Sequence, residues 1–553
     1  MTADSSAKNY ESVSHHKLAS PLQNLLNPIN TFLNGNTSGG IVLLAATIIA
    51  LIWANSNPDG YNGFWGIKLT VSLGRFSMSH SIAEWINDGL MTIFFLSVGL
   101  EIKREMQVGD LSSFGQAILP VTAAAGGMIV PALFFTMCAH GSEYTNGWGI
   151  PVATDIAFAL GAITMLGKRV PSSLKIFLVA LAIADDLGAV LVIALFYSSN
   201  LHFGFLGLAI VICALLILCN KTGMRSLILY CIGGFFIWLF MMHSGVHPTL
   251  AGVMLAITIP STTVIDYGRL RRTIKVTDSI FKRNESFDEH PMSKTEAIGA
   301  AEHLKACINS ALPPLVRLEN ALSTPVAMLI MPIFALANAG VIITKLEPGF
   351  MQSVLTHGIA LGLILGKPIG ITLGTLITVK IGLAKLPRSS TWTQLFGVGM
   401  LGGIGFTMSL FVTGLALPDG PHINTAKLAI LCSSTAAGVL GYIWLYVYSK
   451  THEPVAEEDA EGEEAEAQDK DFDSGDNNSK VAKNTKGIKK AASAKQVKKH
   501  PTGISEGDDK AEDGQNNPSK PKSDSAAEAE RKSSQPPADG KTGGAEEAAP
   551  QKS

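Results

Sequence analysis

The amino-acid sequence predicts an all-α integral membrane protein with about twelve transmembrane helices. Three observations carry this prediction. Of the 553 residues, 47% are hydrophobic and only 16% are charged. Long apolar runs, separated by short polar links, follow one another up to Lys450. Basic residues concentrate in every second link, which is typical of a chain that crosses a membrane repeatedly.

Each apolar run is long enough, or nearly so, to cross the hydrocarbon core, which takes about 20 residues. The predicted spans are centred near residues 47, 92, 126, 157, 185, 211, 233, 253, 332, 367, 405 and 438. Links after the even-numbered spans up to the tenth are basic, and the others are nearly free of lysine and arginine apart from Lys68, Arg75 and Lys345. Because basic links stay in the cytoplasm, both termini are expected there.

Three segments are expected along the chain. Residues 1–21 form a polar cytoplasmic segment without an apolar signal core, and residues 22–450 form the membrane domain. Residues 451–553 form a low-complexity tail with the acidic block EPVAEEDAEGEEAEAQDKDFD and the basic block KVAKNTKGIKKAASAKQVKKH. This tail has too few large apolar residues to offset the entropy of ordering, so it is expected to be disordered. A solvated tail is the simpler interpretation, and a specific binding segment is the alternative.

The first external link predicts a small β-hairpin. Residues 66–80, GIKLTVSLGRFSMSH, alternate apolar and polar side chains, with Ile67, Leu69 and Val71 on one face. An exposed hairpin of this kind offers strand surface to a second copy. We therefore expect a homodimer that forms through this segment.

Two spans carry features that interrupt a helix. GIPVATDIAFALGAI contains Pro151 and Asp155, and GVGMLGGIGFTMSLF contains five glycines within nine residues: Gly397, Gly399, Gly402, Gly403 and Gly405. Both are expected to unwind midway. They are the middle members of spans 3–5 and 10–12, which predicts two inverted-topology repeats whose broken helices cross at the bilayer midplane. The half-helix ends need counter-charges, for which Asp155 and Lys367 are the candidates.

Asp185 and Asp186 stand side by side inside the apolar run ALAIADDLGAVLVIALF. A charged side chain at the centre of a span costs roughly 2.5–3.5 kcal/mol on insertion scales. Two such residues in one run therefore point to a functional site.

Eight segments, in this order, resemble the sodium/proton antiporters of the NhaA family over residues 22–449: SGGIVLLAATIIALIWANS, WINDGLMTIFFLSVGLEIKRE, ATDIAFALGAITMLG, KIFLVALAIADDLGAVLVIALFY, SGVHPTLAGV, FALANAGV, GKPIGI and GGIGFTMSLF. The resemblance implies a secondary active antiporter of the bacterial inner membrane, not an enzyme. It implies export of sodium, and of lithium, against external protons, with two protons per sodium. Its role would be pH and sodium homeostasis. We expect no cofactor and no nucleic-acid partner.

The resemblance implicates Asp185, Asp186, Asp155, Thr154 and Lys367 in ion and proton binding. The chemistry agrees, because sodium is a hard cation that prefers oxygen ligands, and the same carboxylates also bind protons. Neighbouring residues on a helix point about 100° apart, so the two adjacent aspartates need not act alike. Asp186 is predicted to bind the ion, and Asp185 to pair with Lys367.

A second group matches the charged cluster that this family links to its pH response: Glu101, Arg104, Glu105 and Glu319. Histidines that are expected after the last glutamate are replaced by Asn320 and Ser323, so the pH set point does not carry over. His247, which precedes Pro248, is a further candidate because the histidine pKa suits pH sensing.

Plainer structural roles remain open for several of these residues. Lys367 is suited to neutralising a helix end as well as to transport, Asp88 to a cavity or cap, and His247 to a structural hydrogen bond.

Among other classes of protein, an intramembrane aspartyl protease is disfavoured because the motif glycine-x-glycine-aspartate is absent from every span. A prenyl-transferring enzyme is also disfavoured, because it would need aspartates at metal-bridging spacing and DDLGA lacks the third. A transporter of the related fold that carries an organic anion, or another cation, is the remaining alternative.

Overall fold

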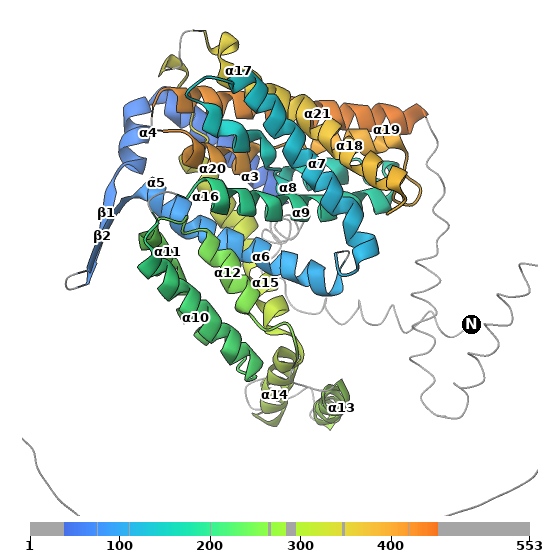
Figure 1. Ribbon diagram of the computed structural model, residues 1–553. Coiled ribbons are helices and arrows are strands. Elements are labelled where there is room, and N and C mark those ends of the chain that lie inside the picture. The colour runs from blue at the N-terminus through green and yellow to red at the C-terminus, as the bar shows by residue number, and fades with distance from the viewer. Residues whose placement is uncertain are drawn as a thin grey trace, which may run out of the picture. The chain divides into compact units, whose positions relative to one another are not determined.

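A computed structural model describes residues 38–73, 76–109, 111–198, 201–263, 267–283, 295–345, 349–418 and 420–451. The predicted N-terminal segment, residues 1–21, and the tail beyond Thr451 lie outside the described residues. The described part is mostly helical, with one two-stranded sheet, as Figure 1 shows.

Ten helical segments in the described part of the chain are long and apolar enough to cross a membrane. They are α3 (Ser38–Ser56), α5–η1–α6 (Ile82–Trp85, Ile86–Leu90, Met91–Val108), α7 (Phe114–Ala139), η2–α8 (Thr145–Val152, Ile156–Met165), α9 (Ser172–Phe196), α10 (Phe203–Lys221), α11 (Leu227–Ser244), α15–η5–α16 (Pro314–Pro325, Val326–Ile330, Met331–Asn338), α17–η8–α18 (Val354–Leu361, Gly362–Gly366, Lys367–Ile381) and α21 (His422–Thr451). An eleventh candidate is the pair α19 (Trp392–Leu401) and α20 (Phe406–Ala416), bent by 53° at its break.

The count of ten or eleven is lower than the predicted twelve because one predicted span is a short helix. The run centred near residue 253 contains α12, Leu250–Thr258, which has only nine residues. Gly245, with a φ of 78°, ends α11 in the left-handed conformation, and the helix resumes only after Pro248. Packing compensates for the shortness: a Cβ on Gly252 would lie 2.2 Å from the Thr92 carbonyl oxygen, so α12 is pressed directly against the backbone of α6.

The remaining elements connect these segments. They are α4 (Pro58–Trp65), β1 (Lys68–Leu73), β2 (Phe76–Ser81), η3 (Gly167–Arg169), α13 (Tyr267–Arg283), α14 (Thr295–Ala311), η6 (Ile343–Lys345) and η7 (Phe350–Gln352). The predicted hairpin is confirmed, since β1 and β2 pair antiparallel with Lys68 opposite Ser81. Leu69 and Val71 on β1 are 50% and 59% exposed.

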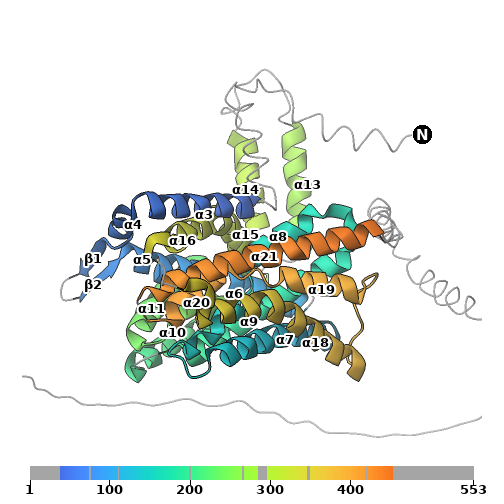
Figure 2. The ribbon, with the colours of Figure 1, turned by 90° about the horizontal axis from the view of Figure 1, so that it is seen from above.

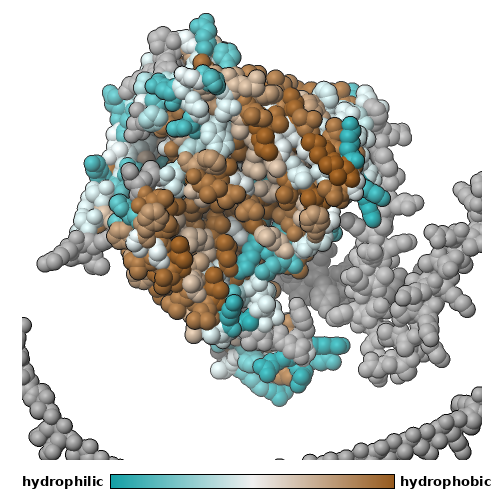
Figure 3. Space-filling view, in the orientation of Figure 1, coloured by the Kyte–Doolittle hydropathy of each residue, from teal (hydrophilic) through white to brown (hydrophobic). Residues whose placement is uncertain are grey.

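The outer surface of the helices is apolar. In α10, only 11% of the residues in its most apolar stretch are buried. Phe203, Val211 and Leu215 are among its exposed side chains. Figure 3 shows a mostly brown surface over the membrane helices, interrupted by pale patches, with most of the hydrophilic residues towards its edges. An apolar surface of this extent is stable against lipid rather than water, which agrees with a multi-pass membrane protein.

The helices α7 and α18 run side by side with their backbones in contact. A Cβ on Gly126 would lie 2.2 Å from the Gly370 carbonyl oxygen, and a Cβ on Gly370 would lie 2.2 Å from the Gly126 carbonyl oxygen. The contact is thus reciprocal, and neither position has room for a side chain. Small residues allow this close approach of helices in membranes. The contact brings predicted span 3 against predicted span 10.

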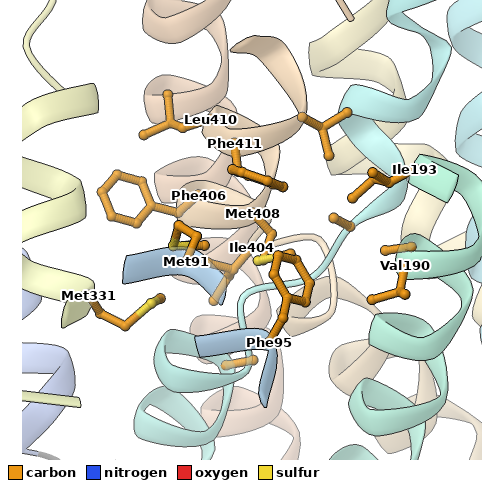
Figure 4. Packing of buried hydrophobic residues seen from close by; sticks show 14 of the residues in the cluster. Met91, Phe95, Val190, Ile193, Met331, Ile404, Phe406, Met408, Leu410 and Phe411 are labelled. Carbon is orange, nitrogen blue, oxygen red and sulfur yellow. The ribbon is translucent and has the colours of Figure 1, made fainter. Parts of the chain in front are cut away.

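The core lies around α20. Figure 4 shows Met91 and Phe95 of α6, Val190 and Ile193 of α9 and Met331 of α16 turned towards Phe406, Met408, Leu410 and Phe411. All of these side chains are buried. In Figure 2, seen from above, α20 lies among other helices rather than at the edge of the bundle. The second half of the bent pair is therefore held inside protein, where irregular backbone can be tolerated.

We predict that Gly126→Ala will lower the free energy of unfolding by about 1–3 kcal/mol, the usual cost of overpacking. The added methyl group has to displace the backbone of α18. Thermal unfolding of the purified protein in detergent measures the effect. Gly207→Ala on α10 is the matched control, because a Cβ there meets no atom within 4 Å. Equal stability of the two variants would contradict the close backbone contact.

Candidate ion-binding site

The fourth predicted span is unwound at residues 153–155, as the sequence predicts. The 3₁₀-helix η2 ends at Val152, and Ala153 is extended, with φ −79° and ψ 149°. Asp155 then caps α8. Its backbone N–H, which has no partner within its own span, donates to the Ile404 carbonyl oxygen at 2.6 Å. The first break is therefore tied to the second.

The second break, residues 402–405, is also present as predicted. Two of its glycines have no room for a side chain: a Cβ would lie 2.3 Å from the Leu363 carbonyl oxygen at Gly403, and 2.3 Å from the Ser409 hydroxyl at Gly405. The start of α20 is capped by α21. The Ser434 hydroxyl accepts from the N–H groups of Gly405 and Phe406 at 3.2 and 3.1 Å.

The Asp155 carboxylate caps both half-helices that begin at these breaks. Its Oδ1 accepts from the Phe158 N–H at 3.3 Å, at the start of α8. Its Oδ2 accepts from the Thr407 N–H at 3.1 Å and from the Thr407 hydroxyl, at the start of α20. Helix N-termini carry partial positive charge and unpaired N–H groups, which a carboxylate satisfies. One buried anion therefore holds two helix ends together.

Lys367 supplies the opposite charge. Its Nζ donates to Thr154 Oγ1 at 2.9 Å and to Asp185 Oδ2 at 2.6 Å. Thr154 Oγ1 in turn donates to the Gly402 carbonyl oxygen at 2.8 Å, just past the C-terminus of α19. The expected pair of Lys367 and Asp185 thus forms, and among the ion pairs between described residues it is the one with both side chains buried. The π-helical turn η8, Gly362–Gly366, ends directly before Lys367.

Asp185 and Asp186 lie in the middle of α9, each 2% exposed. Asp185 Oδ1 and Asp186 Oδ1 are buried and have no hydrogen-bond partner among the described residues. Unpartnered buried oxygens are costly, so a group that satisfies them gains free energy on binding. A proton or a hard cation is such a group.

The charged cluster gathers at the C-terminal end of α6. Arg104 binds Glu105 of the same helix at 2.7 Å and Glu319 of α15 at 2.9 Å. Glu101 lies one turn earlier on α6. The second oxygen of Glu319, Oε2, is buried without a partner among the described residues. Three of the four predicted residues are therefore joined through Arg104, and the fourth lies one helical turn away on α6.

His247 lies apart from this cluster. It sits between α11 and α12, where its Nε2 is 2.9 Å from the Tyr197 carbonyl oxygen. There it lines a cavity of about 370 Å³ together with Asp88, at the opposite end of α6 from Arg104. The hydrogen bond to a carbonyl agrees with the structural alternative for this histidine.

The prediction from the sequence omitted three residues that hold this region together. Thr407 and Ser434 bond the break in the second span, and Lys103 donates to the carbonyl oxygens of Ala256, Ile257 and Ile259 at the end of α12, at 3.3, 2.7 and 2.5 Å. Thr407 lies inside the first turn of α20, one residue past its start, and its hydroxyl donates to Asp155 in another span, so it carries no N-cap signal. Ser434 and Lys103 bond to distant parts of the chain, and no local pattern indicates them.

Comparison with known proteins agrees with this geometry. The family described as Na+/H+ antiporter 1 matches residues 30–445. The Na(+)/H(+) antiporter NhaA of Oleidesulfovibrio alaskensis is 45% identical over 435 residues, 78% of this chain and 97% of that protein. The NhaA of Christiangramia forsetii is 46% identical over 423 residues, covering 76% and 94%, and that of Sulfurimonas denitrificans is 41% identical over 456 residues, covering 79% and 99%. The chain therefore belongs to the Na+/H+ antiporter 1 family, the family of NhaA, and is a multi-pass membrane transporter rather than an enzyme.

Proposed function

We propose that the protein exports sodium from the cytoplasm in exchange for external protons, with the exchange centred on Asp185 and Asp186. The observation that carries this proposal is the pair of adjacent, buried carboxylates with unpartnered oxygens, beside the Lys367 ammonium and the meeting point of two helix breaks. A site with these unsatisfied oxygens attracts small cations and repels organic anions, which speaks against the alternative of an anion carrier. Lithium, also a small hard cation, is a second substrate.

In this mechanism sodium and protons compete for the same oxygens. Asp186, which has no ion-pair partner among the described residues, binds the sodium ion. Asp185 and the Thr154 hydroxyl supply further oxygen atoms. Asp185 is shared between the ion and Lys367. A site loaded with sodium or with protons crosses between the two faces, whereas the empty, doubly charged site is too costly to move. Exchange then follows from competition without a separate gate for each ion.

The formal charges of the site support two protons per sodium. Asp155, Asp185 and Asp186 contribute three negative charges when ionised, and Lys367 contributes one positive charge. Two protons neutralise the remainder, and one sodium ion leaves one negative charge. One net charge then crosses per cycle, so the membrane potential contributes about 2.3 kcal/mol per 100 mV to sodium export.

The proposed architecture has twelve spans, with α12 and the bent pair α19–α20 each counted as one. Spans 3–5 and 10–12 form two inverted-topology repeats. The reciprocal contact of Gly126 with Gly370, and the bonds between the two breaks, support this assignment. Residues 22–450 are the transport domain in a bacterial inner membrane. Both termini, residues 1–21 and the tail 451–553, are cytoplasmic.

The cluster of Glu101, Arg104, Glu105 and Glu319 is proposed to tune activity to cytoplasmic pH. It joins α6 to α15 through Arg104, so a change in its charge alters the contact between two membrane segments. His247 is a second candidate, on the opposite side of the membrane, where its cavity contains Asp88. These roles rest on position and on the family resemblance.

A homodimer is proposed through the hairpin β1–β2. Its apolar face carries Leu69 and Val71, both exposed, next to Ile67, which is 50% exposed. A strand face of this kind at the membrane margin is suited to covering by a second copy.

We predict that Asp186→Asn will abolish sodium-dependent proton movement without changing membrane insertion. The amide keeps the volume of the carboxylate but removes its charge and its titration. The assay is a sodium jump on proteoliposomes that contain a pH-sensitive dye. Asp278→Asn on α13, at an exposed ion pair with Lys282, is the control and is expected to retain exchange. Exchange by the Asp186 variant at the rate of the unmodified protein would overturn the site assignment.

An inside-negative potential is predicted to accelerate outward sodium flux, and the apparent sodium affinity is predicted to weaken as pH falls. The first follows from two protons per sodium, the second from a shared site. Sodium flux from proteoliposomes, with valinomycin setting the potential at several pH values, measures both. A sodium flux independent of the membrane potential would indicate one-for-one exchange. An apparent sodium affinity independent of pH would refute competition of sodium and protons for one site.

Val71→Lys is predicted to convert the dimer to a monomer, because it places a charge on the apolar strand face. Size-exclusion chromatography in detergent with light scattering gives the mass. Ser72→Lys, on the neighbouring exposed position of the same strand, is the matched control and should leave the dimer intact. A dimer that survives both substitutions would exclude the hairpin as the interface.

A further inference from the structure

The helices α13 and α14 pack against each other as a helical hairpin that none of the predicted ion-binding or pH-response roles involves. The last residue of α13, Arg283, forms an ion pair with Glu296 in the first turn of α14. At the other end of the hairpin, the Leu315 N–H of α15 donates to the Pro260 carbonyl oxygen, just after α12, at 3.0 Å. The hairpin therefore leaves the helix bundle where the end of α12 meets the start of α15.

The hairpin runs across the direction of the membrane helices. Figure 2 shows α13 and α14 crosswise to α3 and α21, and in Figure 1 α13 is seen nearly end-on whereas α21 is seen from the side. Both α3 and α21 are candidate spans, and membrane helices are tilted by only about 20° on average from the bilayer normal. The hairpin thus lies closer to the plane of the membrane than to its normal.

One side of the hairpin exposes large apolar side chains. They are Ile274 and Phe281 of α13, Ile298 and Ile308 of α14, and Leu312 directly after it, each between 42% and 47% exposed. None of the five lines the groove of about 460 Å³ between the two helices, which Arg269, Val276 and His303 border. Residues seven apart on a helix point the same way, so Ile274 and Phe281 share one face. An apolar surface of this kind is stable only when something covers it.

Basic side chains border this apolar face. Over the two helices, seven residues are lysine or arginine and three are acidic. Arg271, Lys275 and Lys282 share one edge of α13, and Lys305 lies on α14 between Ile298 and Ile308; all four basic side chains are exposed. A helical element with apolar side chains beside lysine and arginine is typical of segments that lie in the interface of a membrane.

We propose that the hairpin α13–α14 lies on the anionic phospholipid surface of the cytoplasmic leaflet, with its five exposed apolar side chains turned into the interface. The negative surface potential of this leaflet attracts basic segments within about a Debye length. Burial of apolar side chains at the boundary of the acyl chains adds to this attraction. Lipid is the occupant because the hairpin starts at the end of membrane helices and runs along the membrane. The choice of leaflet rests on the proposed topology, in which this basic link is cytoplasmic.

The test is photo-cross-linking of the full-length protein in liposomes of phosphatidylcholine with a small share of phosphatidylglycerol. A benzophenone amino acid replaces Ile298, near the end of the hairpin that is away from the bundle, and the illuminated protein is weighed intact by mass spectrometry. We expect adducts whose added mass is that of one phospholipid. The same probe in place of His303, which is also exposed but lines the groove, is the matched control and should give few.

A second probe position makes the result independent of one substitution. The benzophenone amino acid in place of Phe281 extends a side chain that is already aromatic, so it is expected to leave the fold of α13 intact. It should also give lipid adducts. Val276, on the same helix, is 58% exposed but lines the groove, so the probe at that position is the control.

Charge reversal tests the electrostatic part of the proposal. With the probe at position 298, Arg271→Glu together with Lys275→Glu should lower the yield of lipid adducts about tenfold, because each basic residue near an anionic surface adds to binding. Arg269→Glu together with Arg272→Glu makes the same change in net charge on the side of the groove and should lower the yield much less.

Three results would overturn the proposal: no lipid adducts from either position 298 or position 281, equal yields from these positions and their groove controls, or equal losses in the two charge-reversal pairs. Adducts to a second copy, or to another part of the chain, in place of lipid would make the face a protein-binding surface instead. The added mass is measured without sodium transport and for either leaflet. Failure of the lipid contact and failure of the proposed exchange are therefore distinguishable.

Discussion

The Asp155 carboxylate stands where two interrupted helices meet, and the geometry of the site follows from that contact. Its two oxygens satisfy the first N–H groups of α8 and of α20, while the backbone of Asp155 is bonded to Ile404. Removing one partner of a buried charged contact is costly because the other is left unsatisfied. The two breaks are therefore obliged to stay together. Lys367 of α18 then joins this junction to α9, because its ammonium donates both to Thr154 and to Asp185.

Much of this arrangement could be predicted from local sequence. The spans, the basic links, the hairpin and both breaks follow from hydropathy, charge and the positions of glycine and proline. The two aspartates are conspicuous because carboxylates are rare in apolar runs. The pairing of Asp185 with Lys367 was predicted with the help of the family resemblance, and the structure has this ion pair. The spans, links, hairpin, breaks and aspartates each depend on the composition of one segment, so they can be predicted from that segment alone.

Features that depend on contacts between distant segments were missed. The nine residues of α12 are recognisable as apolar, but their shortness is tolerable only because Gly252 allows α6 to approach. Lys103 looked like an ordinary basic link residue, yet it binds three carbonyl oxygens at the end of α12. The helical pair α13–α14 lies in one of the basic links and was not predicted, because the two helices pack against each other rather than crossing the membrane.

The role of Ser434 bears on how such a protein can change over evolutionary time. Asp185 follows Asp155 by 30 residues, and Ser434 follows Gly405 by 29, at a similar place in the second half of the molecule. Ser434 meets the needs of its helix break with a neutral hydroxyl, whereas the first half places its charges there. The two breaks therefore tolerate different substitutions. Loss of the Asp155 charge disturbs the starts of both α8 and α20, whereas at position 434 another small side chain with a hydroxyl group can accept the same bonds.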